Sequence, residues 1–259
     1  MEKVAKKLDI VLVLLFPSII FLSVFFLNVK INYLESLLLM FGVPSLYLSF
    51  KSRRKVAKVF LFSLLISIPV ALIFELLGVG TQAWVIPHSV FSWRLFSFSP
   101  VENYVWQFLV VYTILIFYEY IRIGTFSQKL SKRVRWIWCV LYSLAFLLVF
   151  LYCIHPSLLA IPYAYIWPGI VLFVIPVFIF LYRNPSFFWP FLKVQVFFFY
   201  LHTLFELIGV KLHHWIYPGH YVGWVTFFGQ GFPLEELIFV MLFGAFTACT
   251  YYEFFGNES

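Results

Sequence analysis

The sequence has little charge and almost no aspartate. Charged residues make up 11% of its 259 residues and hydrophobic residues 63%, whereas about a quarter of a soluble domain is charged. Asp9 is the only aspartate, so the chain has no aspartate-rich motif for magnesium and diphosphate, which argues against a membrane prenyltransferase. Glycine-rich phosphate-binding motifs are absent too, and no nucleotide site is recognisable. The three cysteines form no CxxC pair, and we expect them to be small buried hydrophobic residues: Cys139, Cys153 and Cys249.

Long apolar runs are what the sequence has in abundance. The mean hydropathy is +0.97, and the runs are continuous, unlike the alternating pattern of a membrane β-barrel. We therefore predict an all-α, multi-pass protein of the cell membrane with about eight transmembrane helices, since each span takes about 20 residues. The expected spans are 10–27, 34–50, 59–77, 104–121, 136–153, 158–181, 188–208 and 234–255. Prolines within them predict kinks: Pro17, Pro44, Pro69, Pro168 and Pro176.

Basic residues are concentrated in alternate loops. If the N-terminus is inside, fifteen of the eighteen lysines and arginines lie in inner segments, and only Lys30, Arg94 and Lys211 lie outside. The positive-inside rule then predicts that both termini are cytoplasmic. The net charge of +7 is explained by this orientation and by contact with lipid headgroups, so we expect no nucleic-acid partner.

The chain also repeats itself at an offset of 131 residues. Phe-Glu-Leu-Leu-Gly-Val at 74–79 returns as Phe-Glu-Leu-Ile-Gly-Val at 205–210. After a slip of two residues, Pro-Val-Glu-Asn at 100–103 corresponds to Pro-Leu-Glu-Glu at 233–236. The loop between these motifs carries two tryptophans in each copy: Trp84 and Trp93, then Trp215 and Trp224. Four helices per copy is an even number, so we predict a parallel tandem duplication, with units 1–127 and 128–259.

Each copy has a glutamate at the end of its third helix and another at the start of its fourth: Glu75 and Glu102, then Glu206 and Glu235, which Glu236 follows. We expect these carboxylates to lie at one depth and to meet across a helix pair. His202 precedes Glu206 by four residues, so the two share a helix face within hydrogen-bonding reach. Apolar surroundings disfavour an ionised carboxylate, so one carboxyl group can donate a proton while an ionised partner accepts one.

The aromatic residues, 23% of the chain, have π faces that can stabilise a carbocation without trapping it. Proton-initiated isomerisation of a polyene would use all these features and needs no cofactor. Simpler interpretations remain open. The glutamates can be solvated helix caps, and the loop tryptophans can form an ordinary interfacial belt. We expect Glu119 and Glu253, at inner helix ends, to lie at the interface. His213 and His214 are adjacent and point in different directions, and we predict no metal site.

Together these motifs resemble the lycopene cyclase domain family, whose members are membrane-embedded carotenoid cyclases, over nearly the whole chain. The resemblance implies that Glu235 and Glu236 are paired acids and that Glu102 is the first acid of the other half. Asn103 departs from the pattern, since a second acid is common at its position. The implied reaction protonates a terminal double bond of lycopene, closes a ring and loses a proton, leaving a β- or ε-ionone ring without redox change.

Our leading hypothesis is therefore a lycopene β-cyclase in which Glu235 or Glu236 is the acid and Glu206 or Glu102 the base, with Glu75 also catalytic. Expected substrate-binding residues are Trp84, Trp93, Trp215, Trp224, Asn103 and His202. The expected partners are lycopene in the bilayer and membrane lipid, without a partner subunit, because both halves lie in one chain. Alternatives are another polyisoprenoid enzyme, such as a hydratase, or a non-enzymatic lipid-binding or transport protein. Spans that are nearly free of charge away from their ends argue against transport.

Overall fold

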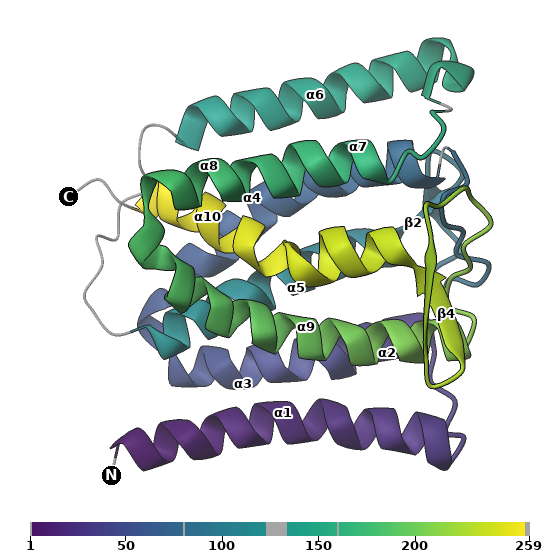
Figure 1. The fold of residues 1–259 in the computed structure, drawn as a ribbon. Helices are drawn as coiled ribbons and strands as arrows, with labels where there is room; N and C mark the ends of the chain where they lie inside the picture. The colour runs from purple at the N-terminus through teal and green to yellow at the C-terminus, as the bar shows by residue number, and fades with distance from the viewer. Residues whose placement is uncertain (1, 80, 123–133, 160, 257–259) are drawn as a thin grey trace.

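The computed structural model describes residues 2–79, 81–122, 134–159 and 161–256, and it is mostly helical (Figure 1). Within these residues, six helices are long and apolar enough to cross a bilayer, which indicates an integral membrane protein. They are α1 (Glu2–Phe26), the run of α2 (Tyr33–Leu37), η1 (Leu38–Gly42) and α3 (Val43–Lys51), α4 (Val56–Phe74) with η3 (Glu75–Val79), α5 (Val101–Ile121), the run of α7 (Ile166–Pro168), η5 (Gly169–Val174) and α8 (Ile175–Arg183), and η6 (Pro185–Phe187) with α9 (Phe188–Lys211).

The other helical segments are α6 (Val134–Ile154), the pair η7 (Glu236–Leu242) and α10 (Gly244–Gly256), and the short turns η2 (Arg53–Lys55) and η4 (Pro156–Leu159). The helices form one bundle. Figure 1 shows the start of α1 and the end of α10 at one end of it, with the β strands at the other. The expected join between units 1–127 and 128–259 lies within 123–133, outside the described residues.

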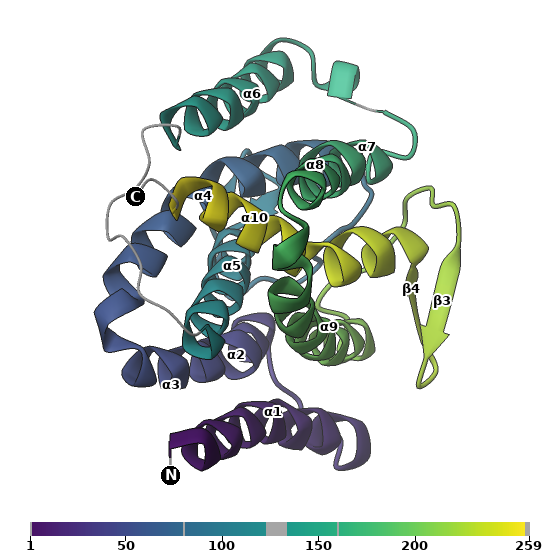
Figure 2. The ribbon, with the colours of Figure 1, turned by 60° about the vertical axis from the view of Figure 1, so that its left-hand side comes forward.

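Helix α5 lies in the middle of the bundle, where it packs against α3, α4, α9 and α10 (Figure 2). Its polar residues Glu102, Asn103 and Gln107 are buried for this reason. Helices α1 and α6 lie on opposite outer edges in both views. Their exposed side chains are mostly apolar, as expected for helices that face lipid; Phe26 and Phe146 are examples.

Two of the prolines expected to kink helices instead follow π-helical turns. Turn η1 comes just before Pro44, and turn η5 just before Pro176. Proline has no N–H to donate to the carbonyl four residues earlier, so the hydrogen-bond ladder shifts by one residue. The N–H of Val43 accordingly bonds to the carbonyl of Leu38, five residues back. Prolines Pro17 and Pro69 lie inside α1 and α4, and Pro168 ends α7.

The secondary structure adds two features that the sequence did not predict. The loops that carry the paired tryptophans each contain an antiparallel hairpin: β1 (Arg94–Leu95) with β2 (Ser99–Pro100), and β3 (Trp224–Phe227) with β4 (Gln230–Pro233). The helix expected from residue 158 begins only at Ile166. Pro162 and the positive φ of Tyr163 prevent an earlier start.

The cysteines were also only partly as expected. Cys249 is buried in α10, but Cys139 and Cys153 are exposed. Both lie on α6, which stands at the edge of the bundle (Figure 1). A helix with that position turns part of its apolar surface outward, where a small hydrophobic residue meets lipid and not protein.

Glu119 and Glu253 are buried in contacts between elements, and they link α5 to α10. Glu119 accepts hydrogen bonds from Lys55 and from the Tyr252 hydroxyl, and its Oε2 is 2.5 Å from the Lys55 Nζ. Glu253 is paired with Arg122 and accepts a hydrogen bond from a tyrosine of α5. A buried carboxylate needs such partners, because its desolvation is otherwise uncompensated.

Candidate active site

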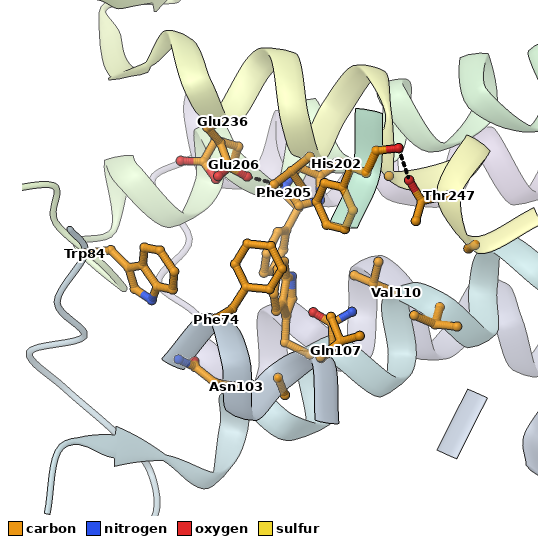
Figure 3. A pocket seen from close by; sticks show the side chains of 18 of the residues that line it. Phe74, Trp84, Asn103, Gln107, Val110, His202, Phe205, Glu206, Glu236 and Thr247 are labelled. Atoms are coloured by element: carbon orange, nitrogen blue, oxygen red, sulfur yellow. Dashed lines mark hydrogen bonds and ion pairs between the residues drawn. The ribbon is translucent and has the colours of Figure 1, made fainter. Parts of the chain in front are cut away.

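A pocket lies within the bundle, near the hairpin end. Residues from α4, α5, α9 and α10, together with the loops that carry Trp84 and Trp215, line it (Figure 3). Most of the lining is apolar, and among the described residues it contains no lysine or arginine. Its polar members, apart from the tryptophans, are Tyr33, Glu75, Asn103, Gln107, Tyr165, His202, Glu206, Tyr217, Glu236, Thr247 and Tyr251. The carboxyl groups of this pocket therefore face no lysine or arginine in its described lining, and His202 is its one imidazole.

One wall of the pocket brings together His202, Glu206 and Glu236, all buried. One potential ligand atom from each lies within 4.8 Å of the others. The imidazole of His202 contacts Glu236 and not Glu206, the residue that shares its helix face: its Nε2 lies 2.9 Å from the Glu236 Oε1. Helix α9 contributes the first two residues, and Glu236 begins the π-helical turn η7. Such turns often occur at functional sites.

Glu206 is held as a hydrogen-bond acceptor. Its Oε1 accepts from the Trp215 indole at 3.0 Å and from the Tyr217 hydroxyl at 2.7 Å. Tyr217 lies in the loop beyond α9, where burial, and next the charge of Glu206, hold its pKa well above the usual value. The phenol therefore stays protonated and keeps donating. Two donors on one oxygen favour the ionised form of Glu206.

Across the pocket, Glu75 has a different environment. Its Oε2 accepts from the Ser99 hydroxyl at 2.5 Å, and its Oε1 accepts from the Asn103 amide nitrogen at 2.6 Å. The Asn103 amide oxygen in turn accepts from the Tyr33 hydroxyl at 2.9 Å. Figure 3 shows Asn103 on the side of the pocket opposite Glu206 and Glu236. Both ends of the Asn103 amide are thus used to fix Glu75.

The adjacent glutamates of the Pro-Leu-Glu-Glu motif point to different places. Glu236 lines the pocket, but Glu235 does not; the Glu235 Oε1 accepts a hydrogen bond from the backbone N–H of Val222, in the loop between α9 and β3, at 2.6 Å. Glu102 also lies away from the lining and accepts from backbone N–H groups of the first loop, 2.6 Å from the Val90 nitrogen and 3.2 Å from the Phe91 nitrogen. The geometry gives these two glutamates a loop-anchoring role, and it does not place them among the acids and bases of the pocket.

The four loop tryptophans also divide into two pairs. Trp84 and Trp215 line the pocket, and each ring lies directly over a glycine. A Cβ on Gly78 would come within 1.9 Å of the Trp84 ring, and one on Gly209 within 2.0 Å of the Trp215 ring. Trp93 and Trp224 are 63% and 55% exposed and do not line the pocket, which leaves the belt interpretation for them.

A cation could be held at the His202, Glu206 and Glu236 cluster, whose donor set suits a divalent metal. The adjacent histidines offer no such grouping within the described residues: His214 is buried and bonded to Ser36, whereas His213 is exposed. If no metal is bound, as we expect, a proton shared by Glu206 and Glu236 takes the place of the cation in the cluster of His202, Glu206 and Glu236.

No family model, curated protein or solved structure matches this chain. The pocket itself adds residues that sequence reasoning missed. Tyr33 and Gln107 gave no signal, because single polar residues in apolar runs are not distinctive. Tyr217 could have been found, since it lies in the duplicated loop only eleven residues after Glu206.

Proposed function

We propose that the protein is an integral membrane carotenoid cyclase that converts lycopene end groups to ionone rings, most simply a β-cyclase. The observation that carries the proposal is the pairing of Glu206 and Glu236, beside His202, in an apolar, aromatic-lined pocket that has no lysine or arginine among its described residues. Two carboxyl groups this close do not both ionise readily, so they form an acid and a base. This is the equipment that a proton-initiated, non-redox isomerisation needs.

The same proposal includes a finer architecture: eight transmembrane helices, a parallel tandem repeat and cytoplasmic termini. The contact between the outer loops supports the repeat. Val85 and Ile216, which are 131 positions apart, exchange two backbone hydrogen bonds of 2.9 Å. Reciprocal pairing of equivalent residues is what a local two-fold axis produces. The glycine–tryptophan contacts at the same offset support it too.

In the proposed reaction, the Glu236 carboxyl group gives its proton to a terminal double bond, forming a C–H bond and a tertiary cation. The electrons of a neighbouring double bond then close the ring as a new C–C bond. The Glu206 carboxylate removes a proton from the carbon next to the displaced cation, which restores a double bond. The proton returns to Glu236 across the gap between the two carboxyl groups, so no redox partner or cofactor is used.

Two alternatives differ in what happens to the cation or whether one forms. A hydratase would let water reach the cation and would release an alcohol. A lipid-binding or transport protein would leave the polyene unchanged. The absence of a lysine or arginine from the described lining of the pocket supports cyclisation over transport.

The test is to express the chain in cells that accumulate lycopene and to separate the pigments by chromatography. We expect cyclic carotenes without an added partner gene, and their loss in Glu236→Gln. The matched control is Glu235→Gln, which changes the neighbouring carboxyl group outside the pocket. Unchanged lycopene with the protein present in the membrane would refute the proposal, and a hydroxylated product would favour the hydratase.

A further inference from the structure

The two sides of the pocket are related by the sequence offset but are not chemically equivalent. Phe74 and Phe205 both line it, as do Glu75 and Glu206. At two other pairs of corresponding positions, which also line the pocket, the residues differ. Ala71 in the first copy corresponds to His202 in the second, and Asn103 corresponds to Glu236. The side that contains Glu75 therefore lacks both the second carboxyl group and the imidazole.

The hydrogen bonds of Glu75 show how the difference between the two sides affects the position of protons. Glu75 uses both of its carboxyl oxygens to accept, from Ser99 and from Asn103. Asn103 is fixed from its other end by Tyr33. Because both oxygens of Glu75 are occupied as acceptors, neither directs a proton at the pocket.

On the side of the pocket that contains Glu206 and Glu236, one carboxyl group is left free to carry a proton. Within the described residues, Glu236 makes one hydrogen bond, between its Oε1 and the His202 Nε2, and the tautomer of the imidazole decides which of the two donates. Glu206, a few ångströms away, takes both of its donors from Trp215 and Tyr217. A single proton shared by the two carboxyl groups therefore resides on Glu236, and Glu206 remains the acceptor.

From this we infer that the pocket has one acid, Glu236, and that Glu75, whose two oxygens both accept hydrogen bonds, stabilises positive charge but does not donate a proton. Each binding event then processes one end of the polyene, and a second ring requires release and rebinding in the reverse direction. The statement about rings rests on the proposed function; the statement about the proton does not.

The structure of the molecule allows both statements to be tested separately. The first measurement is the infrared carbonyl band of protonated carboxylic acids in purified protein at neutral pH, as a difference between wild type and variant. We expect Glu236→Gln to remove intensity from this band and Glu75→Gln to leave it unchanged. Equal losses in both variants, or no loss in Glu236→Gln, would overturn the single-acid assignment.

The second measurement is the number of rings formed in lycopene-accumulating cells. A single acid predicts that Glu236→Gln lowers formation of the first and the second ring together, by about a hundredfold or more, the contribution of a general acid. If each half served one end, Glu236→Gln would accumulate the one-ring carotene, and the inference would be wrong. Glu75→Gln should slow the reaction without changing the ratio of one-ring to two-ring products. If wild type leaves lycopene unchanged, the proposed function fails, and the infrared result still decides the location of the proton.

Discussion

The buried contact between Lys55 and Glu119 allows a prediction about stability that is independent of the proposed reaction. The Glu119 side chain is 1% exposed, and its Oε2 is 2.5 Å from the Lys55 Nζ. In Lys55→Met the carboxylate keeps only the Tyr252 hydroxyl as a side-chain partner among the hydrogen bonds described. Removing one member of a buried pair costs about 3–5 kcal/mol. Because Lys55 is itself 29% exposed, we expect the lower end, about 3 kcal/mol.

For a chain of this size, 1 kcal/mol moves the midpoint of thermal unfolding by about 2–4 °C, so Lys55→Met should lower it by about 6–12 °C in detergent. The double variant Lys55→Met, Glu119→Gln should recover part of this loss, because it removes the uncompensated charge and still accepts from Tyr252. Lys51→Met is the matched control. Its partner Asp9 keeps hydrogen bonds from Tyr47 and Tyr120, so the shift should be smaller. An unchanged midpoint in Lys55→Met, or a double variant that loses the sum of both single losses, would refute the reasoning.

Three further outcomes are expected. Burial, opposed in part by the charge of Glu35, lowers the pKa of His214 from 6.5 to about 4. As the pH falls, the unfolded chain therefore takes up the His214 proton before the folded protein does. The contribution of His214 to stability should be complete above about pH 6.5 and should decrease progressively towards pH 4. His214→Gln should flatten this dependence and exposed His213→Gln should not, as thermal unfolding at several pH values will show. Gly209→Ala should cost about 1–3 kcal/mol by overpacking against an indole ring, whereas Gly231→Ala, whose Cβ would meet nothing nearer than 3.8 Å, should cost less. Incubation with a chelator should leave pigment conversion by isolated membranes unchanged; loss restored by a divalent metal would assign the carboxylate cluster to metal binding instead.

The helical, membrane-embedded character of the protein could be predicted from sequence because it depends on properties that add up along the chain. Hydrophobic content and run length accumulate over about 20 residues, and no single contact decides them. The positions of most helices followed for the same reason. The late start at Ile166 and the π-helical turns before Pro44 and Pro176 did not, because local backbone geometry decides them. The two hairpins are too short to give an alternating pattern.

The sequence by itself also identified the residues of the site by type: glutamates at helix ends, a histidine one turn away and tryptophans in duplicated loops. Which of them share a pocket was a matter of tertiary structure. Glu235 and Glu236 are adjacent in the chain, yet one anchors a loop and the other lines the pocket. Successive residues on a helix point about 100° apart, and only packing against neighbouring elements determines which direction is the interior. For the same reason His202 contacts Glu236 and not Glu206 on its own helix, and Tyr33, from a distant part of the chain, completes the opposite wall.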